Sequence, residues 1–202
     1  MTWPDHEEFL EPLTGSAVGM VPVESRGSLP FALLHGESLV AVASWALGEA
    51  GVELLNFNES WRDVLARGAA LVLHDPLCPG TPVDFLARAT RTAVERSVVV
   101  VGVRPVTDTV RRGDDAAPAP GVGVIGLGEV EDRDGLVTVC SPVVLPHEVL
   151  ARMATRPLTD DLPLLVSQLR RRYDVLLLEA PPTAMRVADE SDVRLLESGA
   201  GD

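Results

Sequence analysis

Apolar residues follow two different periods along the chain, and the two kinds of segment alternate. The short, continuously apolar runs are typical of strands covered on both faces: AVGMVPV (17–23), VELLNF (52–57), AALVLHD (69–75), SVVVVGV (97–103) and DVLLLEA (174–180). Segments with apolar positions at helical spacing follow or separate them, at 37–51, 58–68, 81–97, 146–154, 160–173 and 189–198. This alternation predicts an α/β fold: a three-layer, Rossmann-like, mostly parallel sheet with helices on both faces.

The segment 108–140 breaks the alternation. It has no helical period, and it carries short alternating apolar runs on either side of an Asp/Ala/Pro-rich stretch. We predict two or three strands that leave the sheet as a protruding β-arm, with its tip near 113–121. The whole chain is then one domain over 1–202, with an acidic N-terminal tail over 1–16.

Charge and cysteine content narrow the function classes. The net charge of −13 argues against a nucleic-acid or anionic-membrane partner. A phosphorylated ligand would need a local cluster of arginines. The arginines of RRR (170–172) suit a solvated helix C-terminus, where the helix dipole favours cations. Cys78 and Cys140 make no disulfide framework, so we expect a reduced, cytoplasmic protein.

Polar clusters follow three of the buried runs: Asp75, RPVTDT (104–109) and PPTAMR (181–186). Ligands of open α/β sheets bind outside the carboxyl ends of the strands, so we expect these clusters to converge on one edge. Asp75 is either a Mg²⁺ ligand or a turn carboxylate. Arg186 is either a phosphate-binding fork or a surface cation.

Two further signals concern anion binding. Thr159 and the two aspartates after it precede a helix, where capping and anion binding are both open. The first strand leads into PVESRGSLPF (22–31), which holds only Gly27 and no lysine, so the Gly-rich phosphate loop of nucleotide-binding α/β proteins is absent. His35 and His74 have no second ligand at zinc spacing.

The order of the polar clusters resembles a known family. LVLHDPLCP, PVTDTVRR, EDRDGLVTVCSP, TDDLPLL and TAMRVADESDV are similar, in sequence order over about 17–197, to the motifs of the 2-C-methyl-D-erythritol 4-phosphate cytidylyltransferases. That resemblance implies a nucleotide-diphospho-sugar-transferase-like fold in which the 108–140 arm clasps a second subunit in a homodimer. It also implies CTP and a sugar phosphate as ligands, Mg²⁺ as cofactor, and an isoprenoid-precursor pathway.

The resemblance also assigns roles to residues. It implies that Asp75 is catalytic and binds metal, with Arg186 as the catalytic cation in place of a lysine. Substrate contacts are implied for four positions: Thr109, Arg133, Ser141 and Thr159. Among these, Arg133 is expected to reach the partner's active site and hold the sugar phosphate. Ser60 is expected on the cytidine side.

The departures from the family bear on activity. Phe31 stands where the family has its catalytic lysine, Cys78 stands where it has an arginine, and the chain is shorter between 51 and 60, so a strand–helix unit is expected to be missing. Loss of one donor aimed at transition-state charge typically costs about 10²–10³ in rate. We therefore predict weak or lost cytidylyl transfer. The alternatives are an active enzyme whose rebuilt loop uses Arg26 as the cation, and a non-catalytic dimeric interaction or regulatory protein.

Overall fold

The computed structural model describes residues 17–56, 58–107, 109–114 and 126–199, so the predicted acidic tail and the predicted arm tip beyond 114 lie outside the described residues. The main sheet of this part of the chain has the strand order β10-β6-β9-β5-β1-β4. Its strands are β1 (Ala17–Met20), β4 (Glu53–Leu54), β5 (Ala70–Leu73), β6 (Val99–Pro105), β9 (Val137–Leu145) and β10 (Val175–Glu179). All are parallel except β9, which runs antiparallel to both of its neighbours.

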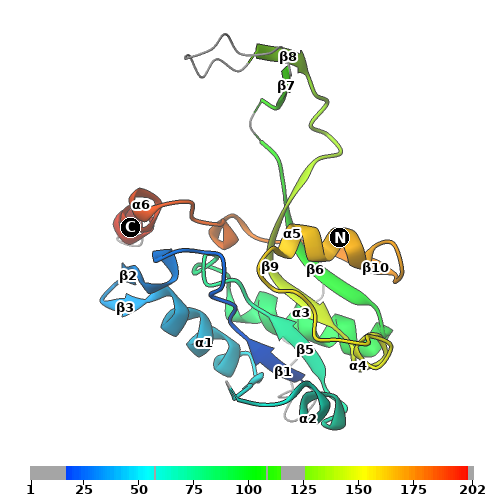
Figure 1. The fold of residues 1–202 in the computed structure, drawn as a ribbon. Helices are drawn as coiled ribbons and strands as arrows, with labels where there is room; N and C mark the ends of the chain where they lie inside the picture. Colours follow the sequence, from blue (N-terminus) through cyan, green and yellow to red (C-terminus); the bar gives the residue numbers. More distant parts are fainter. Residues whose placement is uncertain (1–16, 57, 108, 115–125, 200–202) are drawn as a thin grey trace, which may run out of the picture.

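Helices cover both faces of this sheet (Figure 1). They are α1 (Leu39–Glu49), α2 (Trp61–Ala66), α3 (Val83–Arg96), α4 (His147–Leu150), α5 (Leu162–Leu169) and α6 (Glu190–Gly199). Successive residues of a strand point to opposite faces. Leu71 and Leu73 of β5 thus pack into the cluster with α4 and α5, while Val72 packs into the cluster with α1 and α3. The predicted three-layer α/β fold is confirmed, and each predicted strand and helix is present, several with shorter bounds.

The central strand β9 is missing from the sequence-based prediction. Its run VTVCSPVVL contains Pro142, and a proline, which has no N–H to donate, argues against a central strand. The sheet accommodates it with a register shift between Val101 and Val103 of β6. Gly102 lies at this irregularity, and the backbone carbonyl of Ser141 occupies the place where a Cβ on Gly102 would stand. The bulge sets Ser141 at the sheet edge where β5 ends.

Between β6 and β9 the chain leaves the sheet. The strands β7 (Arg111–Asp114) and β8 (Gly126–Val130) pair antiparallel and project away from the body of the molecule (Figure 1). A protruding β-arm is therefore present, as predicted. A second small sheet joins β2 (Leu33–Leu34) to β3 (Glu37–Ser38), with the 3₁₀ turn η1 (Leu29–Phe31) before it. No helix of the described residues is long and apolar enough to cross a membrane.

Candidate functional site

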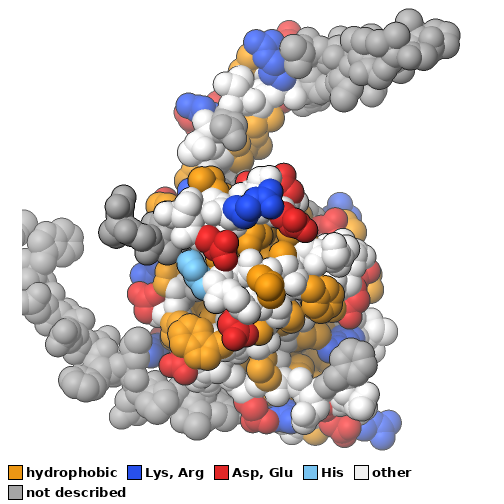
Figure 2. All heavy atoms as spheres, turned by 90° about the vertical axis from the view of Figure 1, so that its left-hand side faces the viewer, with side chains coloured by type: hydrophobic (Ala, Val, Ile, Leu, Met, Phe, Trp, Pro, Cys, Tyr) orange, Lys and Arg blue, Asp and Glu red, His pale blue; other side chains and the backbone are white. Residues whose placement is uncertain are grey.

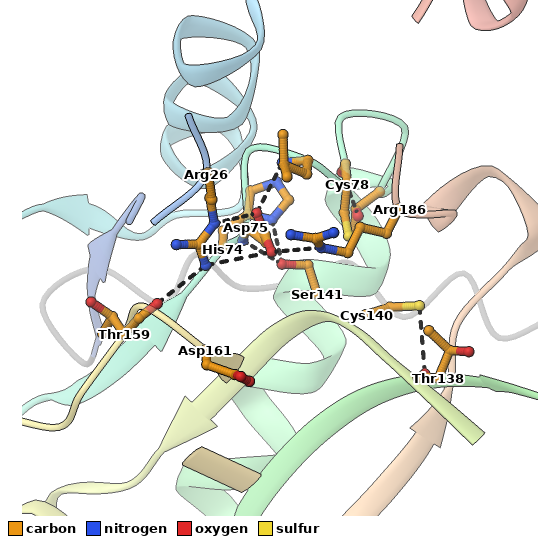
Figure 3. A network of polar contacts seen from close by, with 12 residues as sticks. Arg26, His74, Asp75, Cys78, Thr138, Cys140, Ser141, Thr159, Asp161 and Arg186 are labelled. Carbon is orange, nitrogen blue, oxygen red and sulfur yellow. Dashed lines mark hydrogen bonds and ion pairs between the residues drawn. The ribbon is translucent and has the colours of Figure 1, made fainter. Parts of the chain in front are cut away.

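Asp75 lies just past the carboxyl end of β5 and is the centre of a buried ion cluster (Figure 3). Arg26 Nε donates to its Oδ1 at 2.9 Å, and Arg186 Nε donates to its Oδ2 at 3.2 Å. The backbone N–H of Leu77 also donates to Oδ1, at 3.0 Å, and Arg26 Nη2 lies 3.5 Å from Oδ2. These four donors occupy the roughly four lone-pair sites of a carboxylate.

Arg26 reaches Asp75 because the loop after β1 turns back on itself. Ser25 and Gly27 both have φ of 60°, the left-handed conformation, on either side of Arg26. The remaining guanidinium nitrogens also have partners: Nη1 donates to the carbonyl of Glu24 at 2.7 Å, and Nη2 to the carbonyl of Thr159 at 3.2 Å. Arg26 is only 8% exposed, so its cation is committed to the protein itself.

Arg186 approaches the same carboxylate from the other side. It follows the 3₁₀ turn η2 (Pro182–Ala184), and the N–H of Val187 donates to the carbonyl of Leu77 at 2.7 Å, which ties the two loops together. The Arg186 side chain is 41% exposed, whereas that of Asp75 is 5% exposed. Only Nε of Arg186 faces Asp75 at hydrogen-bond distance among the described residues, so the outer edge of this guanidinium faces solvent.

Ser141 and His74 form a buried hydrogen-bonded pair that contacts the backbone of Asp75. The Ser141 hydroxyl accepts from the N–H of Asp75 at 2.6 Å and lies 2.8 Å from His74 Nδ1. Burial lowers the pKa of His74 to about 4, against a smaller opposing effect of the Asp75 charge. His74 is therefore neutral at pH 7, and the Ser141 hydroxyl is free to donate to Nδ1. His74 and Ser141 position the Asp75 backbone rather than line an open site, since both are fully buried.

The two cysteines are poor nucleophiles. Burial raises the pKa of Cys78 well above its ordinary value, and the nearby Asp75 and Cys140 raise it further. Burial also raises the pKa of Cys140. Neither thiol supplies a thiolate at neutral pH.

Several predicted site residues lie elsewhere or present other atoms. Thr159 contributes its backbone carbonyl to Arg26, and the helix after it is capped by Asp161, whose Oδ1 accepts from Leu164 N–H at 2.8 Å. Ser60 caps α2, where it bonds Asp63. The remaining two, Thr109 and Arg133, are exposed at the base of the arm, where Arg133 Nη1 donates to the carbonyl of Thr107. Asp108, between Thr107 and Thr109, is outside the described residues.

A hollow of about 550 Å³ is lined in part by Glu24 and Thr159, whose backbone carbonyls accept from Arg26. It lies at the carboxyl ends of β1 and β4, where an open α/β sheet binds its ligands. Its lining joins the β1 loop to the segment before α5: Gly19–Glu24, Val40, Ser44, Leu54–Asn56 and Arg156–Asp160. The lining holds a single arginine, Arg156, together with Glu24 and Asp160, so it does not concentrate positive charge.

The cationic triphosphate cradle of the resembled family has no counterpart among the described residues. Phe31, at the lysine position, is 59% exposed, and the chain contains no lysine at all. Figure 2 shows hydrophobic side chains gathered on the face over α1 and the β2–β3 sheet, with Leu33 60% and Trp45 63% exposed. Mg²⁺ does not fit at Asp75 in this arrangement, because two guanidinium groups already occupy the carboxylate oxygens and repel a divalent cation. No group of three potential metal ligands occurs in the part of the chain that the structure describes.

The chain was compared with known proteins by sequence and by structure. No protein-family model matches the chain, and no curated protein matches it in sequence. The fold is similar to that of solved α/β cytidylyltransferase structures. The chain is similar to the crystal structure of 2-C-methyl-D-erythritol 4-phosphate cytidylyltransferase from Thermus thermophilus, with a TM-score of 0.61 and 22% identity over 92% of this chain and 98% of that one.

Two further structures agree. The 4-diphosphocytidyl-2C-methyl-D-erythritol synthase of Anaerococcus prevotii gives a TM-score of 0.61 at 11% identity, over 93% of this chain and 100% of that one. The 2-C-methyl-D-erythritol 4-phosphate cytidylyltransferase of Francisella tularensis gives 0.59 at 10% identity, over 91% and 99%. The fold therefore agrees with the family that the sequence motifs resemble.

The sequence does not predict which side chains pair with Asp75. From the sequence, Arg26 is expected to be a cation that binds phosphate. No local pattern indicates its ion pair with Asp75, because the two residues are 49 positions apart. For His74, the sequence indicates only that no second ligand lies at zinc spacing. The HD dipeptide at the end of a buried strand is the one available signal; the structure pairs Nδ1 of this histidine with Ser141 and leaves its buried Nε2 without a hydrogen-bond partner among the described residues.

Proposed function

We propose that the protein is a divergent member of the methylerythritol phosphate cytidylyltransferase family that has lost competent CTP turnover and keeps an anion-binding remnant at Arg186. The observation that carries the proposal is the saturated Asp75 carboxylate, held by Arg26, Arg186 and the Leu77 N–H. A carboxylate in this state is a structural anchor. Both of its oxygens already accept from these donors, so a metal or a substrate hydroxyl would have to displace one of them.

Phosphoryl transfer depends on positioning and on charge stabilisation around the reacting phosphate. The loop 22–31 supplies neither a Gly-rich cradle nor a free cation, because Arg26 is turned inward and Phe31 faces solvent. Each lost donor costs about 10²–10³ in rate, so the joint loss of loop and lysine reduces transfer to near background.

A sugar-phosphate half-site is the part of the ancestral chemistry that the geometry supports best. The outer edge of the Arg186 guanidinium is exposed, and a guanidinium binds phosphate oxygens as a fork. The predicted hydroxyl contacts from Thr109, Ser141 and Thr159 remain part of this proposal. The buried Ser141 hydroxyl is the least suited of them, since it is used by Asp75 and His74.

We further propose that the arm pairs two copies of the chain. Exposed apolar side chains lie at the end of β8, before β9 and at the start of β9: Val130, Leu136 and Val137, at 58%, 39% and 43% exposure. An arm with such a surface, projecting from the body, favours a second copy as its cover. In that dimer Arg133 would lie near the partner's site. This observation also favours the alternative of a non-catalytic dimeric interaction protein, which keeps the arm and needs no ligand.

Calorimetric titration tests the functional proposal. We expect no binding of CTP with Mg²⁺ at micromolar concentrations. We expect weak binding of methylerythritol phosphate, lost in Arg186→Ala and kept in Arg194→Ala, an arginine of α6 whose side chain is 67% exposed. Micromolar CTP binding that is lost on Arg26→Ala would favour the active enzyme with a rebuilt loop.

A further inference from the structure

A cluster of arginines lies at the end of the molecule opposite the Asp75 site. The antiparallel strand β9 carries the chain from the Asp75 edge to the other edge of the sheet, where α4 begins and β10 later starts. Arg152 follows α4, and the run Arg170–Arg172 follows α5. Two segments distant in sequence therefore bring four arginines together.

These arginines line two adjoining hollows of about 410 Å³ and 360 Å³. Both hollows share four residues, which are Arg152, Arg171, Arg172 and Tyr173. Asp174 lines only the smaller one, so the larger hollow has no carboxylate in its described wall. Arg156 adds a further guanidinium to the wall of the larger hollow.

The charges of this cluster are uncompensated within the described residues. No carboxylate of that part of the chain lies within ion-pair distance of Arg152 or of the three arginines after α5. The C-terminal end of α5 favours cations, which holds the run there despite its mutual repulsion. The net charge of −13 opposes an anion at this cluster only weakly, because charges farther away than about 8 Å are largely screened at physiological salt.

The lining of the larger hollow also contains apolar side chains, here called the apolar wall: Met153, Leu158, Leu165 and Leu169, together with Tyr173. Pockets of roughly 300–1,000 Å³ with apolar walls and a few polar groups hold small organic ligands. The combination fits an anion at one end of a ligand and an apolar or aromatic group at the other.

We propose that this hollow binds a small organic phosphate ester or diphosphate, whose phosphate oxygens are held by the guanidinium groups of Arg152, Arg171 and Arg172. The planar guanidinium group matches the geometry of phosphate oxygens. Because the chain contains no lysine, arginine is the side chain that can hold a phosphate in this way. The apolar body of the ligand packs on the leucines and Tyr173. The site is separate from Asp75 and does not depend on the proposed function.

Calorimetry with inorganic pyrophosphate, inorganic phosphate and phenyl phosphate at fixed ionic strength tests the proposal. We expect binding of pyrophosphate with a Kd below about 1 mM, weakened at least about tenfold in Arg152→Ala/Arg171→Ala. The matched control is Arg62→Ala/Arg194→Ala, which removes the same charge from exposed positions of α2 and α6 and should change the Kd less than about twofold. Absence of pyrophosphate binding, or equal weakening in both double variants, overturns the site.

The apolar wall has its own test. Phenyl phosphate should bind more tightly than inorganic phosphate, by about tenfold, because its ring leaves water for the leucine wall. Equal affinities for the two probes overturn the apolar half of the proposal. The arginine variants also separate the two sites: an anion whose binding is lost in Arg152→Ala/Arg171→Ala and kept in Arg186→Ala belongs here, and the reverse pattern belongs to the Asp75 cluster.

Discussion

Arg26 Nε and Asp75 Oδ1 lie 2.9 Å apart in a pair whose side chains are 2% and 5% exposed. Removing Arg26 leaves the buried Asp75 charge with Arg186 as its remaining cation, and breaking a buried ion pair typically costs about 3–5 kcal/mol. We expect Arg26→Ala to lower the free energy of unfolding by about 3 kcal/mol, measured by urea denaturation. Asp75→Ala in the Arg26→Ala background should cost much less than it does alone, since the two residues share one interaction.

The matched control is Arg67→Ala. Arg67 pairs with Glu53 and Glu59 on the surface, with its side chain 30% exposed, and surface pairs contribute little. A loss of stability in Arg26→Ala no larger than that in Arg67→Ala would mean that the Asp75 cluster is not the anchor described above.

His74 makes stability depend on pH in the acid range. Its pKa is lowered from an ordinary 6.5 to about 4 by burial, so the unfolded chain binds more protons between these values. This contribution to stability is complete above about pH 6.5 and is lost as pH falls toward 4, by on the order of 3 kcal/mol. Denaturation at a series of pH values should show the slope, and His74→Asn, which keeps an acceptor near Ser141, should reduce it. An unchanged slope in His74→Asn would assign the acid sensitivity to other groups.

Two glycines with opposite surroundings test the β6–β9 bulge. A Cβ at Gly102 meets the Ser141 backbone carbonyl, so Gly102→Ala must displace β9 and with it the support of Asp75. We expect a loss of about 1–3 kcal/mol or more in unfolding free energy. Gly48, in helix α1, has no atom within 4 Å of its Cβ position, and Gly48→Ala should stabilise by about 0.5–1 kcal/mol. Similar effects of both substitutions would show that the bulge tolerates a side chain.

The proposed role of the arm predicts that two copies of the chain associate as a dimer. A charge at Leu136, which is 39% exposed, should weaken the proposed dimer because it places an unpaired carboxylate in an apolar contact. We expect Leu136→Asp to shift sedimentation toward the monomer, whereas Leu195→Asp, on α6 and 64% exposed, leaves it unchanged. A wild-type chain that sediments as a monomer at all accessible concentrations contradicts the dimer.

Much of the fold is predictable from the chain itself. The apolar runs and the segments of helical period predict the α/β layers, because a continuously apolar strand must be covered by helices on both faces of the sheet. The strand β9 is not predictable in the same way. Pro142 argues against it, and only the room at Gly102 shows how the sheet admits a proline in its centre.

The sequence predicts where the site lies in the fold, but it does not predict which side chains pair with each other there. Strand-end placement and the motif order lead to Asp75 and Arg186, which the structure brings within 3.2 Å of each other. The inward turn of Arg26 depends on two left-handed residues and on partners far away in sequence, and no local pattern encodes it. The motifs therefore predict where the polar side chains lie, whereas the contacts that Asp75 makes depend on residues distant in sequence.

Pyrophosphate release tests the proposed loss of cytidylyl transfer most directly. The full chain is incubated with CTP, methylerythritol phosphate and Mg²⁺ in a coupled pyrophosphate assay, with Phe31→Lys alongside it as a variant that places a lysine where the family resemblance expects one. We predict release at the background rate for the wild-type chain, because Asp75 is saturated and no cradle among the described residues holds the triphosphate. Steady turnover by the wild-type chain, abolished by Asp75→Asn, would contradict the proposed loss of activity.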